Sequence, residues 1–238
     1  MNKKYIVANW KMNPTSAEEA RSLAQEIQRV ARAEIILCPP FPFLHLVRDA
    51  APGVSLGAQD CFWEQEGAYT GEVSPAQLKS MGCSYVLLGH SERRIHLGET
   101  REMVNKKVQA ALGAGLIPIV LIGEEDRSQT GKGLADSMER VLAGVSKEDR
   151  ARLFLVYEPV WAISTSEGGE PARPEEAKEA IGRMREAACG ARILYGGSVD
   201  ASNAASFLRD GEADGVAVGS ASLRAQEFLQ LVKQAEEV

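Results

Sequence analysis

The chain has 238 residues, of which 45% are hydrophobic and 25% are charged, a composition typical of an ordinary globular protein. Its formal net charge of -6 provides no basic surface, so we expect no nucleic-acid partner. The apolar run within residues 1–10 is too short for a signal peptide or a membrane span, so we expect a cytoplasmic protein without membrane contact. Cysteines stand at positions 38, 61, 83 and 189 without metal-ligand spacing, which predicts buried, reduced thiols and no metal site.

Short apolar runs alternate with segments of helical periodicity along the chain. The first run covers residues 5–8, and residues 16–31 after it have apolar side chains at helical spacing, with Ser16 as N-cap and Glu19 three residues later. The other predicted strands cover residues 35–38, 54–58, 85–88, 117–122, 153–157, 193–195 and 216–218. The other predicted helices lie near residues 43–50, 74–81, 99–112, 134–141, 177–184, 201–208 and 225–232.

Eight strand and helix units of this kind favour a closed barrel. The strands are apolar without alternation, as parallel strands buried on both faces require. A closed (β/α)8 barrel, the TIM-barrel fold of the α/β class, is therefore favoured over an open doubly wound sheet. No low-complexity linker divides the units, so we predict a single barrel domain over residues 1–238.

Reactive groups in such barrels lie where strands end, and few polar residues follow the predicted strands. Glu158 follows an apolar strand and precedes Pro159, which excludes a helix there. This stretch by itself fits a solvated glutamate at a loop edge better than a general base under a closing loop. His90 is predicted to face the same mouth, and the two together would form an acid and base pair. The remaining polar residues at strand ends are Asn9, Lys11, Gln59 and Glu92.

Two glycine turns follow the last two predicted strands, Gly196-Gly197-Ser198 and Gly219-Ser220. Either turn alone fits an ordinary tight turn. Both together, in the loops after strands seven and eight, predict a phosphate pocket made of backbone amides. Lys11 is a candidate cation for an anionic substrate, although an isolated lysine is most often solvated. The other histidines, at 45 and 96, are expected at the surface.

Four blocks of the sequence resemble signature blocks of the triosephosphate isomerase family, and the resemblance spans essentially the whole chain. The blocks are Asn9-Trp10-Lys11, Gly89-His90-Ser91-Glu92-Arg93-Arg94, Tyr157-Glu158-Pro159-Val160-Trp161-Ala162-Ile163 and Tyr195-Gly196-Gly197-Ser198-Val199. Several long blocks in order at predicted strand ends are far more specific than any single motif.

The resemblance implies an isomerase of glycolysis and gluconeogenesis that interconverts dihydroxyacetone phosphate and D-glyceraldehyde 3-phosphate through an enediolate. Glu158 would be the general base and neutral His90 the electrophile. Lys11 would offset negative charge, Asn9 would donate to the carbonyl oxygen, and Glu92 would be a buried glutamate beside the site. The reaction needs no cofactor.

The resemblance also implies a mobile lid and a phosphate grip. Ser91 would hold Glu158 while the lid is open, and Trp161 and Tyr195 would belong to the lid and its support. Remote binding energy from the phosphate would help the lid to close. The amides expected to grip the phosphate belong to Ser164, Ser198, Gly219 and Ser220.

A homodimer is a further implication of the resemblance. The segment 67–72 resembles a loop that inserts into the neighbouring subunit in this family. Thr70 would then lie against the partner's Asn9, the partner's Lys11 and the partner's His90. Glu72 would pair with the partner subunit's Arg93. An ordinary surface loop is the alternative, although Tyr69 between glycines is an unusual residue to expose.

The chain departs from the family around the phosphate grip, since Ser164, Ser166 and Ser220 stand where glycine is usual. The lid's far hinge, residues 167–169, is also unusual, and Leu121 replaces a customary cysteine. Two other functions therefore remain open at this point. One is a different phosphosugar barrel enzyme. The other is a catalytically weakened barrel that binds phosphorylated metabolites or a protein partner.

Restoring glycine at positions 164, 166 and 220 is predicted to raise turnover. A residue other than glycine costs about 1 to 2 kcal/mol wherever the closed lid needs a positive φ, so closure would become roughly tenfold more favourable. Steady-state kinetics of the triple variant test this. Equal or lower activity than the unmodified chain would contradict it.

Overall fold

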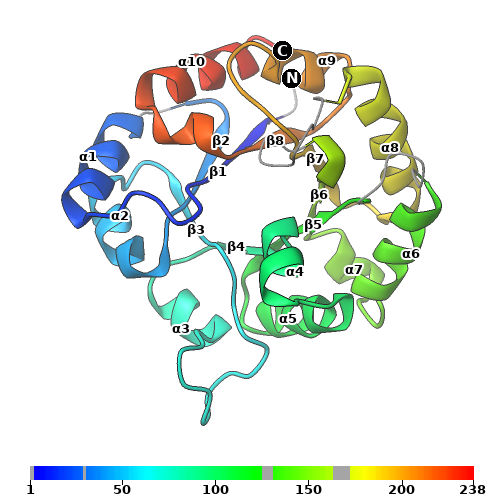
Figure 1. The fold of residues 1–238 in the computed structure, drawn as a ribbon, viewed down its shortest axis with the longest axis horizontal. Coiled ribbons are helices and arrows are strands. Elements are labelled where there is room, and N and C mark those ends of the chain that lie inside the picture. Colours follow the sequence, from blue (N-terminus) through cyan, green and yellow to red (C-terminus); the bar gives the residue numbers. More distant parts are fainter. Residues whose placement is uncertain (1–2, 29–30, 125–130, 163–171) are drawn as a thin grey trace.

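The computed structural model describes residues 3–28, 31–124, 131–162 and 172–238, and of Lys132 only the backbone. Eight parallel strands form a closed barrel in sequence order, and β8 pairs with β1 to complete it. Helices surround the barrel on the outside (Figure 1). The (β/α)8 barrel predicted from the sequence is confirmed, whereas the assignment of residues 1–238 to one domain stays a prediction.

The strands begin and end close to the apolar runs of the sequence. They are β1 (Tyr5–Asn9), β2 (Glu34–Cys38), β3 (Ser55–Ala58), β4 (Tyr85–Leu88), β5 (Ile117–Ile122), β6 (Phe154–Tyr157), β7 (Arg192–Tyr195) and β8 (Gly215–Val218). The helices in the described part are α1 (Ala17–Ile27), α2 (Leu44–Ala50), α3 (Pro75–Ser80), α4 (Ser91–Leu97), α5 (Arg101–Gly113), α6 (Lys132–Val141), α7 (Lys147–Arg150), α8 (Pro174–Ala187), α9 (Ala204–Arg209) and α10 (Ala225–Ala235). Short 3-10 helices η1 (Phe41–Phe43), η3 (Val160–Ala162) and η4 (Ser220–Leu223) complete the set.

Two helices were not predicted from the sequence, α4 and α7. Both are short, with seven and four residues. The apolar residues Ile95 and Leu97 of α4 are 58% and 64% exposed, so they form no stripe facing the core. None of the residues of α7 is buried. Such helices lack the apolar periodicity by which longer helices are recognised.

Aromatic side chains occupy the barrel interior at the amino ends of the strands. The Phe154 ring packs on Tyr5 and Tyr85 with centroid distances of 4.6 and 5.6 Å, and each of these residues begins its strand. The Arg192 guanidinium lies 5.1 Å from the centroid of the Tyr5 ring. These large side chains fill the interior at the amino ends of the strands. The polar residues that follow the strands therefore meet at the opposite end.

The prediction of four buried thiols is correct for Cys38, Cys61 and Cys83 and wrong for Cys189. Cys189 is exposed and has a φ of 51° in the turn between α8 and β7. A residue in that turn lies outside the packed layer between helices and strands. No helix in the described ranges is long and apolar enough to cross a membrane.

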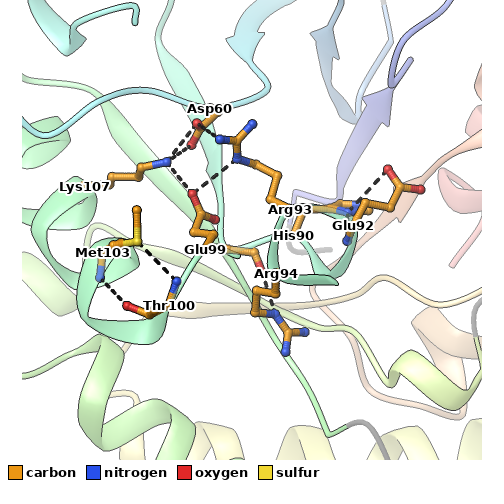
Figure 2. A network of polar contacts seen from close by, with 10 residues as sticks. Asp60, His90, Glu92, Arg93, Arg94, Glu99, Thr100, Met103 and Lys107 are labelled. Carbon is orange, nitrogen blue, oxygen red and sulfur yellow. Dashed lines mark hydrogen bonds and ion pairs between the residues drawn. The ribbon is translucent and has the colours of Figure 1, made fainter. Parts of the chain in front are cut away.

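A buried network of charges fixes α4 against its neighbours (Figure 2). The Lys107 ammonium donates to both carboxylate oxygens of Asp60 at 2.8 Å and also to Glu99. Arg93 from α4 contacts the same two carboxylates, at 2.9 and 3.2 Å. Burial raises the pKa of Asp60 to about 6, against the opposing effect of Lys107. Since Asp60 follows β3 and Lys107 lies on α5, the network ties α4 to both elements.

Candidate active site

A cavity of about 370 Å³ opens at the carboxyl end of the barrel. Its walls come from the loops after β1, β4, β6, β7 and β8, which are far apart in the sequence. The structure thus brings together most of the residues predicted from strand ends. The predicted site residues that line it are Asn9, Lys11, His90, Glu158, Ser198, Gly219 and Ser220.

The Glu158 carboxylate lies at the end of β6 and is only 1% exposed. Its Oε1 atom is 3.3 Å from Nε2 of His90, and its Oε2 atom accepts the backbone N–H of Ser91 at 2.9 Å. Burial raises the pKa of Glu158, while His90 and the Ser91 N–H act in the opposite direction. The two residues predicted to form an acid and base pair therefore lie in contact, and Ser91 contacts Glu158. Their roles stay predictions.

The hydrogen bonds of His90 select one neutral tautomer. The backbone N–H of Glu92 donates to Nδ1 of His90 at 3.2 Å, so Nδ1 is an acceptor. In the neutral ring the proton then lies on Nε2, which faces Glu158. A neutral imidazole held in this way presents an N–H donor to the cavity. His45 and His96 are exposed, as predicted.

Lys11 has a φ of 52°, a left-handed conformation that costs a residue with a side chain about 1–2 kcal/mol. Its N–H donates to Oδ1 of Asn9 at 3.0 Å. The Gln59 amide donates to the carbonyls of Lys11 and Cys38, both at 2.8 Å. Bonds on both sides of Lys11 thus hold this conformation. The sequence placed Gln59 at a strand end but gave no indication of these contacts.

The ammonium of Lys11 forms an ion pair with Glu92. The resemblance implies a buried glutamate at position 92, but in this chain the Glu92 side chain is 37% exposed. It lies in the first turn of α4 and turns away from the buried Arg93 network (Figure 2). Glu92 is therefore a partly exposed partner of Lys11, which itself lines the cavity.

The glycine turn after β7 has no room for side chains. A Cβ atom at Gly196 would lie 2.4 Å from Cγ1 of Val156, and one at Gly197 would lie 2.1 Å from the hydroxyl of Tyr195. The Tyr195 ring stacks on Phe207 of α9 at 3.8 Å, so it has a fixed position beneath the turn. The Ser198 hydroxyl donates to the carbonyl of Ala162 at 3.1 Å. Ala162 ends η3, the segment that also contains Trp161.

Ser220 is not strained, although glycine is usual there. It begins η4, and the only residues other than glycine with a positive φ in the described ranges are Lys11, Cys189 and Glu212. A glycine at position 220 would therefore relieve no strain in this conformation. Ser164 and Ser166 lie outside the described residues, so the predicted effect of glycine there stays a prediction.

The loop between β3 and α3 contains Thr70 and Glu72 and projects from the barrel (Figure 1). Both residues are exposed, and Tyr69 beside them is 46% exposed. Met12, next to Lys11, is 88% exposed. Arg93, the predicted partner of Glu72 across a dimer, already pairs with carboxylates of its own chain. The dimer contacts themselves stay predictions.

Comparison with known proteins agrees with this geometry. The family profile described as "Triosephosphate isomerase" matches residues 4–235. The chain belongs to the triosephosphate isomerase family. A triosephosphate isomerase of Dictyoglomus thermophilum is 43% identical over 254 residues, covering 98% of this chain and 100% of the relative. Relatives of the same name from Thermoanaerobacter pseudethanolicus and Dehalococcoides mccartyi are 42% and 41% identical over 98% and 97% of this chain, and 99% and 95% of their own length.

Replacing Glu158 by Gln is predicted to stabilise the fold at neutral pH. The folded state raises the pKa of Glu158 above 4.5, so the folded protein holds this proton more tightly than the unfolded chain. Stability contributed by the group is complete below the unfolded pKa and is lost as the pH rises through the folded pKa. A neutral glutamine avoids that loss. Chemical denaturation should give Glu158→Gln the larger free energy of unfolding at pH 7, with the difference shrinking toward pH 4.5.

Glu186→Gln on the exposed side of α8 serves as the control and should behave as the unmodified chain at both pH values. If Glu158→Gln were no more stable than the unmodified chain at pH 7, burial of the Glu158 carboxylate would have no net cost in free energy of folding.

Proposed function

We propose that the protein interconverts dihydroxyacetone phosphate and D-glyceraldehyde 3-phosphate through an enediolate. The observation that carries this proposal is the buried contact of 3.3 Å between Glu158 and His90, in a cavity that also contains two glycine turns. Proton transfer next to a carbonyl needs a base and an electrophile aimed at one substrate. Membership of the triosephosphate isomerase family supports the same assignment.

Glu158 is the proposed general base. It removes a proton from the carbon beside the substrate carbonyl, and the neighbouring carbon is then protonated. Burial favours this role because a carboxylate with a raised pKa is a stronger base once ionised. In the structure the carboxylate accepts the Ser91 N–H, so we infer that this bond holds the base at rest and breaks when substrate binds. The reaction requires no cofactor.

Three further residues stabilise the charge that develops on the substrate oxygens in this proposal. The Nε2–H of His90 donates to them as a neutral electrophile. Asn9 uses Oδ1 to accept the Lys11 N–H, which leaves its amide N–H groups for the carbonyl oxygen. The Lys11 ammonium balances negative charge, and the substrate competes with Glu92 for it.

The phosphate of the substrate is assigned to the glycine turns. Ser198, Gly219 and Ser220 line the cavity, and their backbone amides would suit an anion with several acceptor oxygens. The amide of Ser164 is the proposed fourth donor and lies outside the described residues. An imagined Cβ at Gly219 lies 3.9 Å from Nζ of Lys11, which places the cation near this turn. Tyr195 lies against Gly197 of the proposed grip, and Trp161 belongs to the segment η3 that Ser198 contacts through Ala162.

A coupled assay with triose phosphates tests the function and the base together. Glu158→Gln is expected to lose at least about 100-fold in rate, because positioned general bases contribute that much or more. Glu186→Gln should keep full activity. Loss of only a few-fold in Glu158→Gln would move the role to another residue. A folded chain that binds phosphate ligands without turnover would favour the catalytically weakened barrel.

We also propose that the protein is cytoplasmic, since the reaction belongs to glycolysis and gluconeogenesis. We further propose that it is a homodimer. The exposed apolar side chains of Met12, Tyr69, Ile95 and Leu97 support a covered face. Thr70 lies against the partner's His90 in this proposal, and Glu72 pairs with the partner subunit's Arg93.

Light scattering is expected to give twice the chain mass of 25.7 kDa. Tyr69→Asp, which puts a charge into the proposed interface, should shift the protein to the monomer and lower its activity. Tyr69→Phe keeps the ring and should remain dimeric. A monomeric unmodified chain with full activity would contradict the dimer.

A further inference from the structure

The side chain of Asn203 holds the backbone of the loop after β7 at two points. The Asn203 amide donates through Nδ2 to the carbonyl of Ser198 at 3.0 Å. Its Oδ1 atom accepts the backbone N–H of Asp200 at 3.1 Å. One carboxamide thus fixes two points of the loop that contains the Ser198 amide. Such paired bonds restrict the peptide planes on both sides of Val199.

Asn203 makes these bonds in place of a more usual one. It directly precedes α9, the position where asparagine commonly caps a helix by accepting an N–H of the first turn. Its side chain makes no such capping bond. The start of α9 is supported otherwise, because the N–H of Ala204 donates to the carbonyl of Asp200 at 3.1 Å. The Asn203 side chain is therefore committed to the loop and not to its own helix.

Besides Asn203, the bond from the Ser198 hydroxyl to the Ala162 carbonyl and the buried side chain of Val199 hold this loop. Gly196 and Gly197 have no side chains to pack, and their freedom of backbone conformation is large. The helix that follows Asn203 is firmly anchored, since Phe207 is 1% exposed and stacks on Tyr195. Asn203 thus connects an anchored helix to the backbone on both sides of Val199.

We propose that Asn203 is a positioning residue that aims the Ser198 N–H at the phosphate of the substrate. The inference rests on the proposed function, in which this amide grips the phosphate. Asn203 acts only through the loop, because the reacting carbons lie at the other end of the cavity, beside Glu158 and His90. It therefore contributes to the preference for phosphorylated over unphosphorylated trioses.

The test compares two substrates that differ only in the phosphate, D-glyceraldehyde 3-phosphate and D-glyceraldehyde. Asn203→Ala removes both bonds, and Asn203→Asp keeps an acceptor for Asp200 but sets a carboxylate against the Ser198 carbonyl. Both variants should lose about tenfold or more in kcat/KM for the phosphorylated substrate, mainly through KM. Their kcat/KM for D-glyceraldehyde should change less than twofold. The binding constant of inorganic phosphate, measured by calorimetry, should weaken by a similar factor.

Ser202→Ala is the matched control. Ser202 stands next to Asn203, and its hydroxyl bonds the Asp200 carboxylate and not the loop backbone. It should leave both substrates and phosphate binding unchanged. Circular dichroism and the thermal midpoint of each variant report on folding. If Asn203→Ala does not fold, Asn203→Asp decides, because it retains one of the two bonds and a favoured residue before the helix.

Two results would overturn the positioning role. One is an equal loss for both substrates, which marks a general structural effect. The other is unchanged phosphate affinity in both Asn203 variants. An unmodified chain that binds phosphate but does not turn over triose phosphates would instead refute the proposed function. In that case calorimetry with inorganic phosphate still decides whether Asn203 positions the loop.

Discussion

The burial of the Glu158 carboxylate is the constraint on which the rest of the site depends. A carboxylate that is 1% exposed needs donors close by, and the ring of His90 and the N–H of Ser91 supply them. Both donors belong to the start of α4. That helix is short and exposes its apolar residues, so packing alone does not hold it. The network of Arg93 with Asp60, Glu99 and Lys107 ties α4 to β3 and α5 (Figure 2).

The close approach of two strands gives Glu158 its position. The N–H of Glu158 donates to the carbonyl of Ile122 at 2.8 Å. Gly123 follows β5, and a Cβ atom there would lie 1.8 Å from the carbonyl oxygen of Glu158. Only glycine allows this approach. The aromatic residues that fill the amino end of the barrel leave the carboxyl end as the place where such strand-end groups meet.

Local sequence patterns predicted the barrel and the group of residues around Glu158 and His90, because both depend on where apolar runs end. Glu158, His90 and Lys11 each follow such a run, and the structure brings them to one cavity. The contacts of Gln59 and Asn203 were not predictable in this way, since an amide side chain gives no sign of which backbone groups it will bind. The pairing of Asp60 with Lys107 joins residues 47 apart and depends on packing between elements. The prediction that Cys189 is buried was wrong, because its exposure depends on the conformation of a turn.

The two ends of the cavity are built by different strands, and hydrogen bonds from Gly196 and Ser198 join them. β4 and β6 supply His90 and Glu158, whereas β7 and β8 supply the glycine turns. The bond from Ser198 to the carbonyl of Ala162 joins the loop after β7 to η3, which follows Glu158 in the chain. Any shift of Ser198 on binding an anion therefore acts on the segment that follows Glu158. In the proposed function, binding energy from the phosphate contributes in this way to releasing Glu158 from Ser91, and a substrate without phosphate lacks this contribution.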